Sequence, residues 1–503
     1  MRRVLLCVLV LLVLCACTLS DDDVSSSRQK EESVEESSNE FPSLSDEEIA
    51  ERVEKHLTTM TIEQKAGQML MAERNAIDCY EIKTYNIGSV LTGPGQNPVN
   101  KKYYNWVDVY NNTQSCALQS ETQIPLLYSV DAVHGHSLVQ GATIFPHNIG
   151  LGAANDPVLM YQIGSVTAKE LARTGVNWNF SPAVSVVKNI QWGRTYESFG
   201  ENPEIHRQLV GPYIRGLQSY QRIATAKHFI ADGGADIRDQ RGGNWSIDQG
   251  NVSISIEEIE RIQLPGDIKA IYSCILSVMV AYNSVHDVKL HQHEEWITGY
   301  LKGKLGFNGI VVSDYEAIKQ IPNANYYQQV VLAINAGLDV LMEPHSWKEA
   351  HKHIVSAVKQ GDIPMERIDD AVRRVLTVKY QVGLFENPRV EKTPGALSTD
   401  EHKQVAREAV RKSLVLLKNE QDILPLKKDS NILLLGPGAD GLSIQTGGWT
   451  VRWQGAEPGD VIEGTTISDA FKFVVQGNGR KINTNVFDAK NAEVAVVGLA
   501  EIP

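Results

Sequence analysis

The sequence predicts an α/β protein whose larger part is a (β/α)8 TIM-like barrel. Short apolar segments alternate along the chain with stretches of helical apolar spacing, and these segments lack the polar alternation of a half-exposed strand. Most of them end in a polar or charged residue, which is where such barrels carry their chemistry. The candidate parallel strands are "IGSVLTG", "IPLLYSVD", "VNWNFSP", "RIATAKH", "LSVMVAYN", "GIVVSD" and "GLDVLME". An eighth strand is not evident, so a doubly wound open sheet is the alternative.

Changes in composition divide the 503 residues into five segments. They are a lipoprotein signal peptide (1–17), a disordered acidic and Ser-rich tether (18–43), the barrel (44–385), a linker (386–400) and the start of an α/β sandwich domain (401–503). The barrel opens with "LSDEEIAERVEKHLTTM", a helix with an acidic first turn. The Pro, Gly and charges of "ENPRVEKTPGALSTDE" mark the linker. The last segment repeats the α/β pattern in "LVLLKN", "NILLLGPGA" and "EVAVVGLAE", and we expect it to be incomplete.

The N-terminus has the pattern of an export signal. Arg2 and Arg3 precede a purely apolar stretch, as in secretory signals. The ending "LCAC" resembles a bacterial lipoprotein box in which Cys17 becomes the acylated first residue, with ordinary cleavage nearby as the alternative. We therefore expect a protein of the periplasm or outer membrane that contacts the membrane only through a lipid anchor at Cys17.

Charge and cysteine content exclude several classes of partner. The formal net charge of -13 argues against a nucleic-acid partner, because phosphate binding requires clustered Lys and Arg. Beyond Cys17, the cysteines Cys79, Cys116 and Cys274 are too few for a disulfide framework and lack the paired spacing of a zinc site. One Cys79–Cys116 bridge remains open. The sequence predicts neither a metal site nor a cofactor.

Several polar residues stand at or just after the ends of the predicted strands. They are Asp131, Lys227, His228, Tyr282 and Asp314. Because a barrel collects the carboxyl ends of its strands on one face, we expect these side chains to be neighbours around a ligand. Each alone has an ordinary structural explanation, such as a loop cap or a salt bridge.

Two loops offer further candidates. "IQWGRTYESFGEN" presents Arg194 beside Glu197 and Glu201, either to bind hydroxyls or as a surface ion-pair network. "TGGWTVRWQG" presents Trp449 and Trp453, which could stack on a sugar ring or cover a domain interface. The stretch "HQHEE", in contrast, is predicted to lie in a solvated helix.

Taken in order, these motifs resemble the family 3 glycoside hydrolases, and within them the branch of β-glucosidases and exo-β-1,3/1,4-glucan glucohydrolases. The matching stretches include "VDAVHGHSLVQGATIFPHNIGLGA", "WGRTYESFGE", "AKHFIADGG", "GFNGIVVSDYEAI" and "GGWTVRWQG". The resemblance runs from about residue 44 to 503.

The resemblance implies a role for each candidate residue. Asp314 is expected to be the nucleophile of a retaining mechanism, with Tyr315 as an aromatic wall of the pocket. Asp131, Arg194, Lys227 and His228 correspond to the family's hydrogen-bonding set around the terminal glucose, and Tyr282 to a tyrosine near the nucleophile. Trp449 or Trp453 is expected to clamp the next sugar.

The second catalytic carboxyl group is the point at which this sequence departs from the family pattern. In the family the acid/base glutamate lies in a motif like V-G-E-x-P-Y-x-E, and here the match "VVGLAEIP" ends at Pro503, with Glu501 at the first glutamate. We expect the acid/base beyond Pro503 and the natural protein to be longer. A second departure is that both Asp239-Gln240 and Asp248-Gln249 could supply one acidic contact.

The expected activity is that of a retaining, exo-acting β-glucosidase that hydrolyses terminal β-D-glucosyl residues of β-glucan oligosaccharides through a covalent glycosyl-Asp intermediate. A β-xylosidase or mixed glycosidase of the same family is one alternative. A glycan-binding lipoprotein without catalytic activity is the other. The preference for β-1,3 or β-1,4 linkages stays open.

Overall fold

The computed structural model describes residues 44–97, 103–240, 244–476 and 482–501. The expected signal peptide, tether and lipid-anchored Cys17 lie outside the described residues. The described residues form one compact unit.

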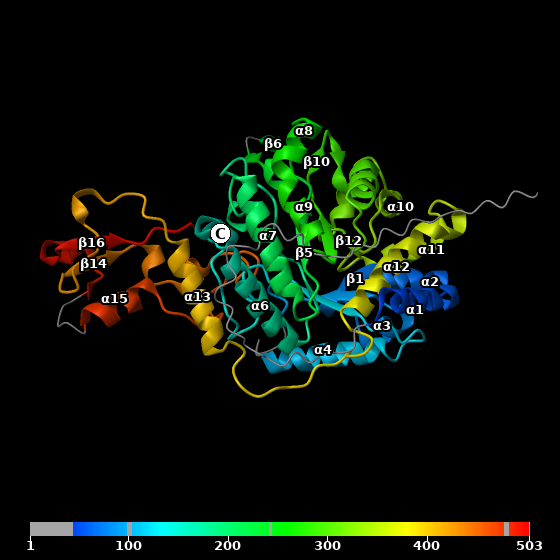
Figure 1. Ribbon diagram of the computed structural model, residues 1–503, viewed down its shortest axis with the longest axis horizontal. Helices are drawn as coiled ribbons and strands as arrows, with labels where there is room; N and C mark the ends of the chain where they lie inside the picture. Colours follow the sequence, from blue (N-terminus) through cyan, green and yellow to red (C-terminus); the bar gives the residue numbers. More distant parts are fainter. Residues whose placement is uncertain (1–43, 98–102, 241–243, 477–481, 502–503) are drawn as a thin grey trace, which may run out of the picture. The chain divides into compact units, whose positions relative to one another are not determined.

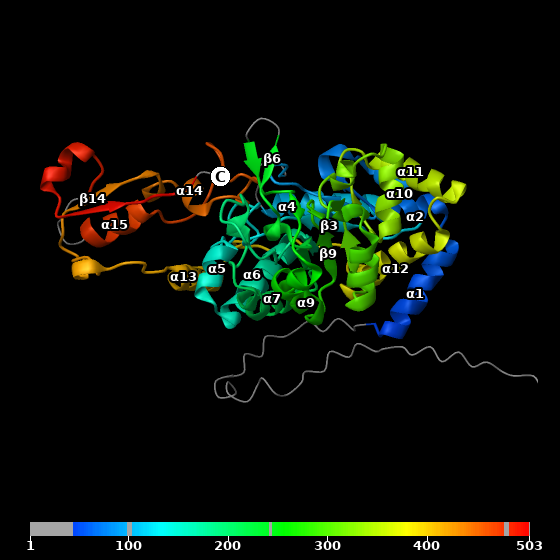
Figure 2. The ribbon, with the colours of Figure 1, turned by 90° about the horizontal axis from the view of Figure 1, so that it is seen from above.

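Eight parallel strands of the described chain form a closed barrel, which helices surround (Figure 1, Figure 2). The strands are β1 (Leu70–Glu73), β2 (Ser89–Leu91), β3 (Leu127–Val130), β4 (Trp178–Asn179), β5 (Thr225–Phe229), β9 (Ser277–Val280), β12 (Ile310–Val312) and β13 (Leu341–Met342). Their hydrogen-bonded orders are β13-β1-β2-β3-β4 and β12-β9-β5. Parallel bridges from Trp178 to Ile223 and from Val312 to Val340 join the two sheets. Closure confirms the barrel and shows that the open-sheet alternative is wrong.

The strand missing from the sequence prediction is β1. Its residues, "LMAE", pair in parallel with β2 and β13 and are fully buried. Leu, Met and Ala are strong helix formers, and the strand has no β-branched residue, so its local sequence does not favour a strand. Its two neighbours in the barrel impose the extended conformation.

The helices begin at well-defined caps. Ser45 and Glu48 form a capping box at the first helix, and Asp156 and Asn202 cap two helices that begin with proline. The helices are α1 (Asp46–Thr59), α2 (Ile62–Gln68), α3 (Cys79–Tyr85), α4 (Tyr103–Ala117), α5 (Asn148–Ala154), α6 (Pro157–Thr174), α7 (Pro203–Gln218), α8 (Ile256–Glu258), α9 (Pro265–Tyr272), α10 (Tyr326–Ala336), α11 (Trp347–Gln360), α12 (Met365–Gln381), α13 (Asp400–Ser413), α14 (Leu442–Thr446) and α15 (Ile467–Gln476). A π-helix, η7 (Glu295–Lys304), precedes β12.

Short strands follow the barrel strands β5 and β9. They are β6 (Arg238–Gln240), β7 (Asn244–Ser246), β8 (Asn251–Val252), β10 (Ser284–Val285) and β11 (Val288–Lys289). β6 and β7 form an antiparallel pair, and β10 lies between β8 and β11.

Alternate residues of the barrel strands pack together in a cluster separate from the one that faces the helices, and we infer that this cluster fills the barrel. Its members include Met71, Leu91, Trp178, Phe180, Met279, Ile310 and Met342. Four of them, Leu91, Phe180, Met279 and Met342, also line the cavity described below. The packed interior is therefore the floor of that cavity.

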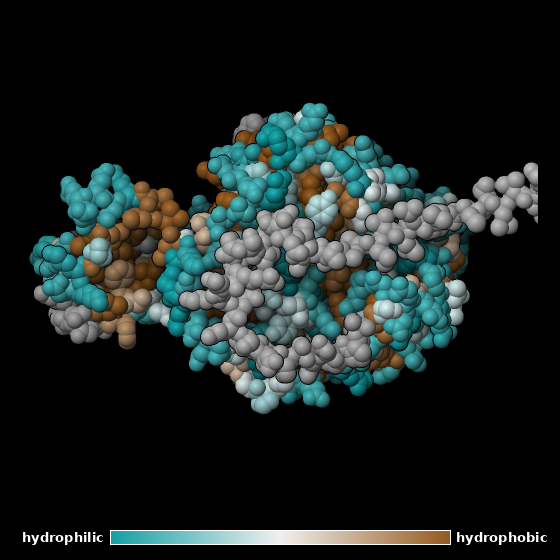
Figure 3. Space-filling model, viewed as in Figure 1, coloured by the Kyte–Doolittle hydropathy of each residue, from teal (hydrophilic) through white to brown (hydrophobic). Residues whose placement is uncertain are grey.

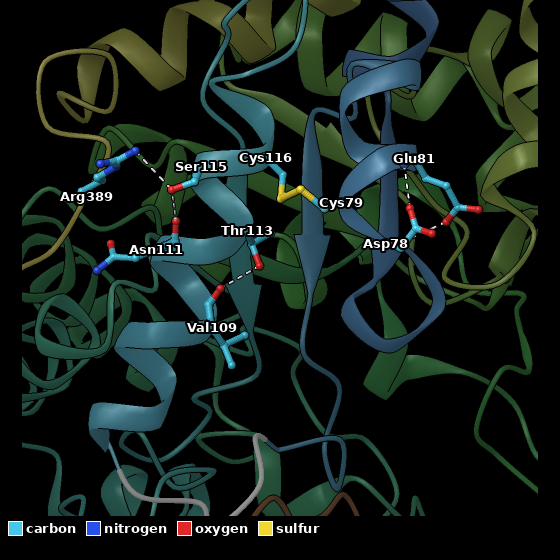
Figure 4. Close-up of a disulfide and its surroundings, with 9 residues drawn as sticks. All are labelled: Asp78, Cys79, Glu81, Val109, Asn111, Thr113, Ser115, Cys116 and Arg389. Atoms are coloured by element: carbon cyan, nitrogen blue, oxygen red, sulfur yellow. Dashed lines mark hydrogen bonds between the residues drawn. A yellow bond between two sulfur atoms is a disulfide. The ribbon is translucent and has the colours of Figure 1, made fainter.

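The disulfide that the sequence left open is present in the structure (Figure 4). Cys79 at the start of α3 is bonded to Cys116 near the end of α4, with 5.3 Å between their Cα atoms. It closes a sequence separation of 37 residues. Such a link restricts the unfolded chain more than the folded one.

Removal of this disulfide is expected to lower the free energy of unfolding by about 4 kcal/mol. Urea unfolding of Cys79→Ser, Cys116→Ser and the double variant measures the loss. Each single substitution should cost about as much as the double one, because either of them breaks the bridge. Additive losses would contradict a bond in the folded protein.

The C-terminal part of the chain contains a three-stranded parallel sheet in the order β15-β14-β16. Its strands are β14 (Ile432–Leu435), β15 (Ile482–Asn483) and β16 (Val494–Val497), as expected for "NILLLGPGA" and "EVAVVGLAE". The expected strand "LVLLKN" is wrong: Leu414 and Leu417 are 75% and 91% exposed, and no described strand pairs with this segment. An apolar run without a partner strand cannot satisfy its backbone groups by pairing. Apolar residues also gather at the surface around β14 and α15 (Figure 3).

Candidate active site

Side chains at the carboxyl ends of the barrel strands surround a cavity of about 330 Å³. It has the size and mixed polar and apolar lining of a small-ligand site. All nine residues that the sequence singled out for nucleophilic attack and substrate binding line it: Asp131, Arg194, Lys227, His228, Tyr282, Asp314, Tyr315, Trp449 and Trp453. The barrel thus brings them together as expected, and their individual roles stay predictions.

Asp314 lies two residues after the end of β12 and presents one free oxygen to the cavity. Its Oδ1 accepts a hydrogen bond from the Tyr315 backbone N–H at 2.7 Å, and its own N–H donates to His291 Nε2 at 3.1 Å. Its Oδ2 has no hydrogen-bond partner and lies 3.5 Å from His228 Nε2. The backbone therefore fixes the carboxylate while one oxygen is left for a ligand.

Burial raises the pKa of Asp314 above its ordinary value, and the nearby His228, Arg194 and Lys227 act in the opposite direction. A carboxylate that attacks must be ionised, so Arg194 and Lys227 favour the reactive form of Asp314. Burial also makes the ionised oxygen poorly solvated, which increases its tendency to interact with a developing positive charge.

A buried ion pair supports the wall beside Asp314. Arg194 donates to Glu197 through Nε at 2.8 Å and through Nη2 at 3.1 Å, a bidentate geometry. Burial opposes ionisation of Glu197, but Arg194 outweighs it and the pKa falls to about 2. The loop "WGRTYESFGE" thus contains a buried Arg194–Glu197 ion pair. The alternative interpretation of Arg194 as part of a surface ion-pair network is therefore wrong.

His228 connects this pair to a further acid. Its Nδ1 lies 2.8 Å from Asp232 Oδ2, and Arg194 Nη2 lies 3.3 Å from its Nε2. Burial, and then the Arg194 charge, lower the pKa of His228 to about 3. The imidazole is therefore neutral at physiological pH. Burial raises the pKa of Asp232 to about 6.

Lys227 contacts both an acidic and an aromatic residue of the cavity, Asp131 and Trp449. Its Nζ donates to Asp131 Oδ1 at 3.0 Å and lies 4.7 Å from the centre of the Trp449 ring. Burial raises the pKa of Asp131, and Lys227 opposes this effect. An ammonium and a carboxylate placed together in this way can donate to and accept from adjacent hydroxyl groups.

The tryptophan loop of the C-terminal part is anchored on the barrel. Ser137 Oγ donates to the Trp449 carbonyl at 2.6 Å, and His147 Nε2 lies 2.8 Å from the Gly448 carbonyl oxygen. Trp449 is buried, whereas Trp453 is 50% exposed at the cavity mouth. Their ring centres are 6.3 Å apart. Trp453 therefore has the free aromatic surface that could stack on a sugar.

His136, in the segment that carries Ser137, is buried beside Trp106 and bonded to Thr174. Burial lowers its pKa to about 3, so the unfolded chain takes up a proton below pH 6.5 that the folded chain does not. The free energy of unfolding therefore falls as the pH falls. As the pH falls from 6 to 4, the free energy of unfolding of the wild type should therefore decrease, relative to that of His136→Gln, by about 1.4 kcal/mol per pH unit. Urea midpoints measured across this range test the expectation, and a constant gap would contradict it.

Comparisons with known proteins agree with this geometry. Residues 61–378 match the "Glycosyl hydrolase family 3 N terminal domain", and residues 414–502 match the "Glycosyl hydrolase family 3 C-terminal domain". The chain belongs to glycosyl hydrolase family 3.

Solved structures of family 3 proteins superpose on the chain. A Q683A mutant of an exo-1,3/1,4-β-glucanase from Pseudoalteromonas is 39% identical with a TM-score of 0.84, over 92% of this chain and 77% of that one. A β-glucosidase from Listeria innocua in complex with isofagomine is 25% identical with a TM-score of 0.77, over 91% and 64%.

Curated family 3 relatives are longer than this chain. A lysosomal β-glucosidase of Dictyostelium discoideum is 29% identical, and the match covers 90% of this chain and 61% of the relative. A periplasmic β-glucosidase of Salmonella typhimurium is also 29% identical, over 78% of this chain and 51% of the relative. The chain thus spans between half and two thirds of these relatives.

Two tyrosines complete the family 3 cavity. Tyr315 is 39% exposed and forms part of the wall, as expected. The Tyr282 hydroxyl donates to the Tyr315 carbonyl rather than to Asp314. Burial, and then the charge of Asp314, raise the pKa of Tyr282. Tyr282 is therefore near the nucleophile but is held by the backbone beside it.

The structure corrects or extends several sequence predictions about this site. His291 of "HQHEE" is not solvated: it is 1% exposed and receives the Asp314 N–H. Asp248 and Gln249 line the cavity, whereas the Asp239 side chain is outside the described part of the structure. Glu501 is exposed and does not line the cavity. Glu73 lines the cavity but was missed together with its strand.

Proposed function

We propose that the chain is a retaining, exo-acting β-glucosidase that acts on terminal β-D-glucosyl residues of β-glucan oligosaccharides. The observation that carries the proposal is the unpartnered Asp314 Oδ2 in a buried cavity flanked by Arg194 and Lys227. Two solved relatives, an exo-1,3/1,4-β-glucanase and a β-glucosidase, support the glucan substrate.

In the first step, Asp314 Oδ2 forms a bond to the anomeric carbon as the bond from that carbon to the leaving oxygen breaks. Positive charge develops on the sugar ring in this transition state, and a close carboxylate stabilises it. A water oxygen then displaces Asp314 from the same carbon, so the configuration is retained. Lys227, Asp131 and Arg194 would hold the ring hydroxyls meanwhile.

Hydrolysis of an unactivated glycoside also requires a second carboxyl group, which protonates the leaving oxygen and then takes a proton from the attacking water. A 2,4-dinitrophenyl leaving group departs without that proton, so its release in the first turnover reports on attack by Asp314. We expect dinitrophenol release from the β-glucoside and none from the α-glucoside. Faster release from the β-xyloside would favour the β-xylosidase alternative. A chain that binds glucose but releases dinitrophenol from neither β-glycoside would be a glycan-binding protein.

We also propose export and lipid anchoring at Cys17, which the sequence pattern supports. Among the described residues, no helix is long and apolar enough to cross a membrane. Labelling of growing cells with a palmitate analogue tests the anchor, and Cys17→Ser should abolish incorporation.

A further inference from the structure

Glu73, the last residue of β1, is a buried carboxyl group in the cavity that has no assigned role. It is 2% exposed and lines the cavity. Its Oε2 accepts the Gly93 N–H at 3.1 Å, and its Oε1 has no hydrogen-bond partner. A Cβ atom on residue 93 would lie 3.2 Å from Oε2, so glycine allows this close approach. The result is a fixed carboxyl group with one oxygen free.

The free oxygen is costly unless something binds it. Glu73 forms no ion pair within the described part of the chain. Burial raises its pKa to about 7, while the Gly93 N–H and Arg74 oppose the rise. Buried carboxyl groups in proteins are normally paired or hydrogen-bonded. A ligand hydroxyl would satisfy the remaining oxygen.

The position of Glu73 indicates which sugar it would meet. β13 separates its strand from the strand of Asp314, and β2 separates it from that of Asp131. Its charge reaches Tyr315, whose pKa is raised to about 12 by burial and then by Glu73. The adjoining loop binds the tryptophan loop, since the Gly95 N–H donates to the Val451 carbonyl at 3.0 Å.

Glu73 thus lies on the side of the cavity formed by Tyr315 and the tryptophan loop. The terminal sugar is expected at Asp131, whose strand end lies beyond β2, and at Lys227, which donates to Asp131. We propose that Glu73 binds a hydroxyl group of the second sugar, on the leaving-group side of the cleaved bond, and so favours a disaccharide over glucose. This assignment rests on the proposed function.

Isothermal titration with glucose and with thiocellobiose and thiolaminaribiose, which resist hydrolysis, tests the assignment. At pH 8, where the carboxyl group is ionised, Glu73→Ala should weaken disaccharide binding about tenfold, because a hydrogen bond to a charged group is lost. Glu73→Gln should weaken it by about fivefold, since a neutral bond remains. Glucose binding should be unchanged in both.

Glu343 provides a matched control. Glu343 directly follows the neighbouring strand β13 and is fully buried. Like Glu73, it has an Oε1 without a hydrogen-bond partner, and burial raises its pKa to about 7. It does not line the cavity, and its Oε2 accepts from the Tyr326 hydroxyl at 2.8 Å. Glu343→Gln should leave both affinities unchanged.

Three other outcomes would overturn the assignment. Unchanged disaccharide binding in Glu73→Ala and Glu73→Gln refutes it and leaves the proposed function intact. A parallel loss of glucose and disaccharide affinity shows that Glu73 supports the cavity rather than the second sugar. If the wild-type chain binds neither sugar, the proposed function fails and the assignment fails with it.

Discussion

Asp314→Asn is expected to lower dinitrophenol release from the activated β-glucoside by about 10⁴-fold or more, because removal of a nucleophile eliminates the covalent route. The amide has nearly the same shape, and its oxygen can still accept the Tyr315 N–H that Oδ1 accepts at 2.7 Å. It cannot form the glycosyl ester, however. Initial rates at saturating substrate measure the loss, with glucose affinity expected to persist.

Asp267→Asn is the control for this experiment. Asp267, in α9, is a buried carboxyl group outside the cavity, and burial raises its pKa well above the ordinary value. Burial disfavours the charged form of this carboxyl group, so the amide is a conservative replacement. Its rate should match that of the wild type. Equal rates in Asp314→Asn and the wild type would remove Asp314 from the mechanism.

Arg194→Met should lower the free energy of unfolding by about 3 to 5 kcal/mol, because it leaves the Glu197 carboxylate buried without its partner. Glu197 is 1% exposed, and among the described residues only Arg194 donates a hydrogen bond to its carboxylate oxygens. Urea unfolding of the variant measures the loss.

The double variant Arg194→Met/Glu197→Gln isolates the pair from the packing effect of the shorter side chain. The two single variants, Arg194→Met and Glu197→Gln, are measured beside it. The double variant should lose less stability than the sum of the two single losses, since the unpaired charge has been removed. Strictly additive losses would show that the bidentate contact contributes little. Arg194→Met and the double variant should also weaken glucose binding, because Arg194 lies at the cavity wall.

The barrel strands that the sequence revealed are those with β-branched or aromatic residues and a polar end, such as β12 with Asp314. β1 was not predictable locally, because "LMAE" is extended only through its neighbours β2 and β13. Glu73 was missed for the same reason. "LVLLKN" is the opposite case, a predicted strand that the structure lacks: its composition favours a strand, but no described strand pairs with it.

The candidate site was predictable where a family motif and a strand end coincide, as at Lys227 and Asp314. The partners that tune these residues come from distant segments. His291 binds the Asp314 N–H from 23 residues upstream, and Ser137 holds Trp449 across 312 residues. Such contacts depend on barrel closure and on packing between segments, which no local pattern encodes.

The most direct test of the central claim is the site of covalent labelling by 2,4-dinitrophenyl 2-deoxy-2-fluoro-β-glucoside. The fluorine slows hydrolysis of the glycosyl-enzyme, and the leaving group needs no acid, so the intermediate should accumulate. Intact mass should show one adduct per chain, and peptide mapping should place it on Asp314 within the segment 305–318. An adduct on another carboxyl group, or no adduct on a folded chain that binds glucose, would contradict the account.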